Sequence, residues 1–158
     1  VEAVNFNAPH QVVIAGHRVA VERAAAVMKR KGAKRALLLP VSAPFHSSLL
    51  KPAAERLAQA LADIELEAPT IPVLNNVDVA LVSAPSEIRS ALARQACLPV
   101  RWVESVRRIA AAPVRYIIEC GPGRVLAAMT RRSAPEIESL ALTDEAPLVK
   151  ARQAVAHD

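Results

Sequence analysis

From residue 36 onward the chain alternates between short apolar runs and amphipathic segments, and this order constrains the fold more than any other feature. Runs typical of strands lie at residues 36–41, 71–74, 114–119 and 139–142. Segments with helical spacing of apolar residues follow them, at residues 48–64, 86–97, 100–111, 124–132 and 147–156. A repeated strand–helix order is typical of a parallel sheet covered by helices. We therefore predict an α/β fold for this part of the chain.

The first 35 residues follow a different pattern. Two strands are expected close together, at residues 1–6 and 11–15, and a helix at residues 18–31 that ends at Gly32. This order predicts most of a small α+β subdomain that lacks its first elements.

The composition narrows the class of protein. Apolar residues make up 53% of the chain but aromatic residues only 3%, so the core is built from small aliphatic side chains, as in sheets of buried parallel strands. So few rings argue against stacking platforms for single-stranded nucleic acid. No apolar run reaches the roughly 18 residues of a membrane helix, and no leader segment is visible. Cys97 and Cys120 are interpreted as reduced thiols, so we expect a cytoplasmic protein.

The formal net charge is +5. Such an excess is either a solubility margin or a sign of an acidic partner. The densest basic cluster surrounds the expected end of the first helix, where cations also favour the helix dipole. Its members are Lys29, Arg30, Lys31, Lys34 and Arg35.

His46 is the best single candidate for chemistry. It lies in an expected turn between a strand and a helix, where open α/β sheets bind ligands. A histidine there is a general base for a hydroxyl nucleophile, an ordinary surface-loop histidine, or one that caps the helix. No G-x-S-x-G motif occurs in the chain, so a serine of the nucleophile-elbow type would lie outside it. No two histidines have metal-ligand spacing, so no metal site is expected.

Amide side chains mark four further positions. The backbone carbonyl of Gln95 is expected to lack an intrahelical donor because Pro99 has no N–H; the alternative is an ordinary solvated glutamine. Asn75 follows a short strand, and Asn5 and Asn7 lie in the first strand and just beyond it. For these three, turn chemistry is the alternative to a role in a site.

Ten short segments, in order along the chain, resemble the malonyl-CoA:acyl carrier protein transacylase family. They include residues 4–9 (VNFNAP), 11–16 (QVVIAG), 44–47 (PFHS), 73–78 (VLNNVD) and 121–126 (GPGRVL). The others are residues 32–36, 39–42, 50–54, 94–95, and 99–100 with Trp102. The resemblance covers essentially the whole chain.

The resemblance implies the C-terminal half of a catalytic unit about twice as long. Residues 1–41 would be most of a ferredoxin-like small subdomain, incomplete at its N-terminus. Residues 42–158 would be the C-terminal part of an α/β-hydrolase-like large subdomain. The family's nucleophile elbow, its GQGSQ-type loop and the arginine that binds the malonyl carboxylate belong to the absent half, so the chain alone is expected to be an inactive fragment.

The family's reaction is transfer of a malonyl group from malonyl-CoA to the phosphopantetheine thiol of acyl carrier protein, through a serine acyl-enzyme, in fatty acid biosynthesis. By resemblance, His46 is the base, and the backbone carbonyl of Gln95 replaces the acid of a Ser-His-Asp triad. No bound cofactor is implied. The positions that match the family's binding cleft or its basic surface are Asn5, Asn7, Asn75, Lys34 and Arg35.

Two residues depart from the usual stand-alone pattern. Phe45 stands before the histidine, as in malonyl-selective acyltransferase domains of multienzyme synthases, where the ring crowds out an α-methyl branch. His10 replaces a usual glycine in the first turn. The alternatives are therefore a polyketide synthase domain and a non-catalytic module that binds acyl carrier protein. A basic nucleic-acid-binding protein is a remote third, since cations and aromatic residues do not form a common stripe.

Overall fold

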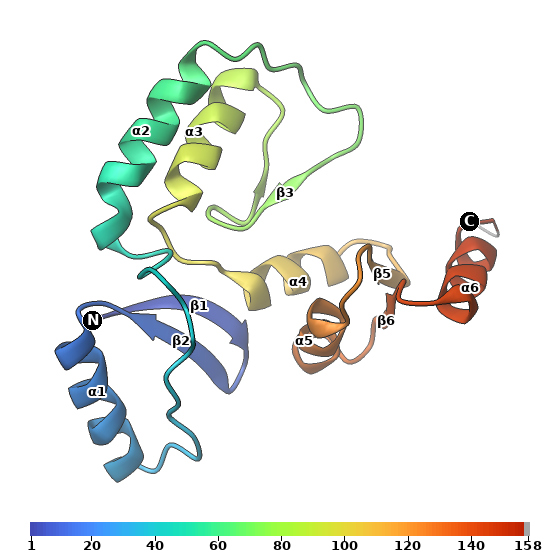
Figure 1. The fold of residues 1–158 in the computed structure, drawn as a ribbon. Helices are drawn as coiled ribbons and strands as arrows, with labels where there is room; N and C mark the ends of the chain where they lie inside the picture. Colours follow the sequence, from blue (N-terminus) through green and yellow to red (C-terminus); the bar gives the residue numbers. More distant parts are fainter. Residues whose placement is uncertain (157–158) are drawn as a thin grey trace. The chain divides into compact units, whose positions relative to one another are not determined.

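The computed structural model describes residues 1–156, in which helices and short paired strands are joined by irregular segments (Figure 1). The chain divides into two compact units, one of Val1–Phe6 and Val12–Arg101, the other of Asn7–Gln11 and Trp102–Asp158. The expected subdomains at residues 1–41 and 42–158 concern a longer protein and stay a prediction. Residues 157–158 of the second subdomain lie outside the described residues.

The first elements agree with the sequence pattern. Strand β1 spans Glu2–Ala8 and pairs with β2 at Gln11–Ala15, and helix α1 spans Arg18–Arg30. The chain leaves α1 through Gly32, whose φ of 95° suits a residue without a Cβ.

Strand β1 has a second neighbour far along the chain. The Phe6 amide donates to the Val100 carbonyl and the Val100 amide donates to the Val4 carbonyl, both at 2.9 Å. Asn5 and Val100 thus form an isolated parallel bridge. This bridge fixes the backbone just beyond Pro99.

The expectation of a buried strand at residues 36–41 is wrong. The segment has no regular structure, and Leu37 and Val41 are 75% and 61% exposed. A strand needs a ladder partner for its N–H and C=O groups, and no described segment pairs with this one. The run expected at residues 71–74 is reduced for the same reason to β3, Leu74–Asn75, paired antiparallel with β4, Ala80–Leu81.

Two helices lie side by side in the first unit (Figure 1). A 3-10 turn η1 at Ser48–Leu50 leads into α2, Lys51–Ala62, and α3 spans Pro85–Gln95. The Arg89 guanidinium of α3 donates to the carbonyls of Leu61 and Ile64, at 2.7 and 2.8 Å. Leu61 is in the last turn of α2 and Ile64 lies just beyond its end, so the cation is placed at the negative end of the helix dipole.

The second unit contains the expected parallel pair. Helix α4 spans Trp102–Ala110, α5 Val125–Ser133 and α6 Glu145–Ala156. Strands β5, Tyr116–Glu119, and β6, Glu138–Ala141, are parallel and joined through α5. The mixed α/β class is confirmed, but the described strands form three two-stranded sheets and not one continuous parallel sheet.

The core of the second unit is aliphatic, as the composition predicts. Val106, Ala134 and Ile137 are buried together, with Trp102 and Ile117 packed against them. The Glu119 carboxylate accepts from the Ala127 amide at 2.8 Å, which ties the end of β5 to the start of α5. Throughout residues 1–156, no helix is long and apolar enough to cross a membrane.

Candidate active site

His46 lies in a tight turn that is bonded on both sides. The Ser47 hydroxyl donates to the Pro44 carbonyl at 2.6 Å, and the Ser48 amide donates to the Glu2 carboxylate at 3.0 Å. The Ser48 hydroxyl also donates to Glu2. His46 has a φ of 61°, which is unfavourable for a residue with a Cβ and persists only where the surroundings hold it.

The His46 ring contacts a backbone carbonyl 49 residues away. Its Nδ1 lies 2.8 Å from the carbonyl oxygen of Gln95. A carbonyl only accepts, so Nδ1 carries a hydrogen and donates it. In the neutral ring, Nε2 then keeps its lone pair and is able to take a proton from a substrate or nucleophile.

The free carbonyl of Gln95 results from the way α3 ends. The amides of Cys97 and Leu98 both donate to the Arg94 carbonyl, at 3.1 and 2.9 Å. The next residue that would reach Gln95 is Pro99, which has no N–H. The Gln95 carbonyl therefore has no amide donor at position 99 and lies within hydrogen-bonding distance of His46.

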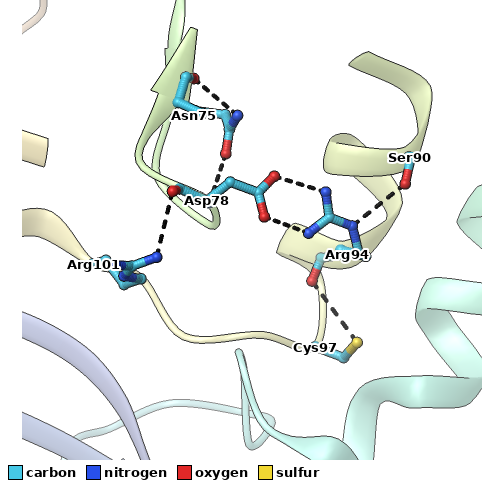
Figure 2. Close-up of polar contacts among 7 residues, drawn as sticks. Asn75, Asp78, Ser90, Arg94, Cys97 and Arg101 are labelled. Atoms are coloured by element: carbon cyan, nitrogen blue, oxygen red, sulfur yellow. Dashed lines mark hydrogen bonds and ion pairs between the residues drawn. The ribbon is translucent and has the colours of Figure 1, made fainter. Parts of the chain in front are cut away.

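Next to Gln95 lies an ion pair between Arg94 and Asp78, which the sequence did not predict. Figure 2 shows the Arg94 guanidinium donating to both oxygens of Asp78, at 2.6 and 2.7 Å. These hydrogen bonds lower the pKa of Asp78 below its ordinary value and raise the pKa of Arg94, although partial burial opposes both shifts. Asp78 and Arg94 both lie in segments that carry the family resemblance. This position was the one feature of the sequence that could have pointed to a role for the pair.

The Asn75 side chain is used inside its own turn. Its Nδ2 donates to the Ala80 carbonyl at 3.0 Å, and its Oδ1 accepts from the Asp78 amide at 2.8 Å (Figure 2). Asn75 is buried, so these bonds satisfy an amide that would otherwise be costly to desolvate. The observed contacts are turn chemistry, and the cleft-lining assignment stays a prediction.

Known proteins show strong similarity to this chain, although no protein-family model matches it. A malonyl CoA-acyl carrier protein transacylase of Salmonella typhimurium is 53% identical over 148 residues, which are 94% of this chain and 48% of that protein. The chain belongs to the malonyl CoA-acyl carrier protein transacylase family. It spans about half the length of the curated relatives that it matches.

Solved structures of the transacylase family have the same fold over nearly the whole chain. The acyl-carrier-protein S-malonyltransferase of Burkholderia pseudomallei is 56% identical with a TM-score of 0.93, over 96% of this chain and 50% of that one. A malonyl-transacylase in complex with its type II PKS acyl-carrier protein is 49% identical, also with a TM-score of 0.93, over 96% of this chain and 49% of that one.

The remaining residues expected from the family pattern are not joined to the histidine. Phe45 precedes His46 and is 48% exposed, and Asn5 lies half-buried in β1. Lys34 and Arg35 are exposed in the segment after α1, and no hydrogen bond of the described residues links them to His46 or Gln95.

Asn7 is half-buried and belongs to the other compact unit. Over residues 1–156, no group of three His, Cys, Asp or Glu residues could hold a metal ion.

Proposed function

We propose that the complete protein transfers a malonyl group from malonyl-CoA to the phosphopantetheine thiol of acyl carrier protein, in fatty acid biosynthesis. The observation that carries the proposal is the 2.8 Å contact between His46 Nδ1 and the Gln95 carbonyl. In a member of the transacylase family, this contact leaves Nε2 free to act as the base. The partner of Nδ1 is then a backbone carbonyl instead of the carboxylate of a Ser-His-Asp triad. Membership of the family supplies the substrate class.

In the first step, a serine outside this chain attacks the thioester carbon of malonyl-CoA. The serine C–O bond forms, the C–S bond breaks, and His46 Nε2 moves the serine proton to the departing CoA thiolate. In the second step the phosphopantetheine thiol gives its proton to Nε2 and attacks the malonyl-serine. The new C–S bond forms, the serine C–O bond breaks, and Nε2 returns the proton to the serine oxygen. Gln95 accepts from Nδ1 throughout, which stabilises the positive charge that the ring acquires.

The other matched positions have binding roles in this proposal. Phe45 restricts the space beside the malonyl methylene and so disfavours an α-methyl branch. Lys34 and Arg35 meet the CoA phosphates or the acidic surface of acyl carrier protein, which gives a partner to the excess charge of +5. Asn5, Asn7 and Asn75 are assigned cleft-lining roles only by their match to the family's positions.

A second candidate is the same reaction in polyketide biosynthesis. The observation in its favour is the similarity to a malonyl-transacylase solved with a type II PKS acyl-carrier protein. Loading assays against fatty-acid and polyketide carrier proteins separate the two, because the true partner shows the higher kcat/KM.

The test of the base is His46→Ala in the complete protein. We expect the rate of malonyl loading onto the enzyme, followed by mass spectrometry, to fall about 10²- to 10⁴-fold. The control is His17→Ala, since His17 is an exposed histidine before α1 whose side chain makes no capping bond. Loading at an unchanged rate by His46→Ala would show that His46 is not the base.

The nucleophile is tested by removing the rest of the enzyme. The 158-residue chain alone is expected to release no CoA from malonyl-CoA above the uncatalysed rate, and addition of the N-terminal half is expected to restore release. Enzyme-like turnover by the chain alone would contradict the assignment of the serine to the other half.

A further inference from the structure

The backbone around Gln95 is anchored on both of its sides to the turn between β3 and β4. On the helix side, Arg94 binds Asp78 through both carboxylate oxygens and also approaches the Ser90 hydroxyl at 3.4 Å (Figure 2). Beyond Pro99, the Arg101 amide donates to the Asn76 carbonyl at 3.2 Å. The Arg101 guanidinium donates to the Asp78 carbonyl at 3.4 Å. The base-binding carbonyl thus lies between two attachments to one turn.

The turn that receives these bonds is itself internally fixed. The Asn75 amide bridges the Asp78 N–H and the Ala80 carbonyl, so the Asp78 side chain leaves from a closed loop. A bidentate carboxylate–guanidinium pair also fixes the relative orientation of its two groups. Asp78 therefore acts as a rigid point to which the last turn of α3 is attached.

The ion pair has little value as a source of stability. Its side chains are 34% and 40% exposed, and exposed pairs contribute little to the free energy of unfolding. Its position is of greater consequence, because Arg94 immediately precedes Gln95. A displacement of the Gln95 carbonyl by about 1 Å would take the 2.8 Å contact with His46 beyond hydrogen-bonding distance.

We propose that the Asp78–Arg94 ion pair positions the base of this enzyme: it fixes the end of α3 and hence the direction of the Gln95 carbonyl that holds His46 Nδ1. The proposal rests on the proposed function for its kinetic consequence, but its geometric consequence is independent of any activity. Asp78 and Arg94 are positioning residues, since they act on His46 through Gln95.

The test uses Asp78→Asn, Arg94→Gln and the corresponding double variant in the complete protein. Each single variant is expected to lower kcat for malonyl transfer about ten- to a hundredfold, the effect of a small misplacement of a catalytic group. The KM for malonyl-CoA is expected to stay within about twofold, because neither residue is placed in the substrate cleft. The double variant should be no slower than the slower single variant, since each residue acts through the other.

A spectroscopic readout tests the geometry without activity. At alkaline pH, where an imidazole is neutral, ¹⁵N NMR of the ring distinguishes a hydrogen on Nδ1 from one on Nε2. The wild-type protein is expected to show His46 with Nδ1–H, and Asp78→Asn and Arg94→Gln to show a mixture of tautomers. Arg94→Lys keeps the charge but loses the bidentate geometry, and is expected to be intermediate in both kcat and tautomer.

The control is Arg18→Gln, which removes the exposed Arg18–Glu22 pair of α1 and should change neither readout. Wild-type kcat together with an unchanged Nδ1–H signal in both single variants would overturn the positioning role. A variant that fails to fold is identified by its far-UV circular dichroism spectrum. In that case the kcat and the tautomer of Arg94→Lys decide whether the ion pair positions His46. Absence of malonyl transfer by the wild-type protein would overturn the proposed function instead, while the tautomer measurement would still decide the positioning role.

Discussion

One side of the turn at His46 is held by a carboxylate from the first strand. Glu2 accepts hydrogen bonds from both the amide and the hydroxyl of Ser48. The bond from the hydroxyl, and then that from the amide, lower the pKa of Glu2 below its ordinary value of 4.5. These bonds help to hold His46 at a φ that its side chain disfavours.

The Glu2 bonds predict a pH dependence of the turn. A carboxyl whose pKa is lowered by folding stabilises the fold above its unfolded pKa, and this contribution is lost as pH falls through the folded value. The Ser48 amide proton, followed by NMR, is therefore expected to shift with an inflection below pH 4.5. Glu2→Gln should abolish the inflection, whereas Glu22→Gln on α1 should leave it. An inflection that persists in Glu2→Gln would assign the titration to another group.

At the scale of elements, the sequence pattern predicted the helices and strands whose formation depends mainly on neighbouring residues. The amphipathic helices, the β1–β2 pair and the parallel β5–β6 pair lie near their expected residues, because spacing and turn residues specify them. Pro99 indicated that the Gln95 carbonyl lacks an intrahelical donor, but the sequence alone left an ordinary solvated glutamine as the alternative. Residues 36–41 were not predictable, since an apolar run becomes a strand only when another segment pairs with it. The Asp78–Arg94 pair was missed because one sequence does not reveal which distant charges meet.

The end of α3 provides a direct test of the role of Pro99. Leu98 still donates to the carbonyl four residues earlier, so an N–H at position 99 would point towards the Gln95 carbonyl. Pro99→Ala is expected to supply this competing donor and to lower kcat for malonyl transfer roughly three- to tenfold, the value of one ordinary hydrogen bond.

The matched control for Pro99→Ala is Pro85→Ala. Pro85 is the first residue of the same helix, where an added N–H meets no carbonyl that the site uses. An unchanged kcat in Pro99→Ala would show that the contact between His46 and Gln95 does not need the missing donor.

At the scale of the whole molecule, residues 36–41 present an apolar surface that no described part of this chain covers. Leucine and valine side chains are exposed there in succession, and contiguous apolar surface of this kind marks an interface. The chain spans about half the length of its relatives. We therefore expect the rest of the complete protein to cover this segment.

Leu37→Asp in the complete protein tests whether the segment is covered. A leucine that becomes buried contributes about 1.5–3 kcal/mol, and we expect the free energy of unfolding in urea to fall by at least this amount, because a charge replaces it. Ala33→Asp is the control, since it adds the same charge to an exposed position nearby and removes only a methyl group. Equal, small losses in both variants, within about 0.5 kcal/mol, would show that residues 36–41 stay exposed to solvent in the complete protein.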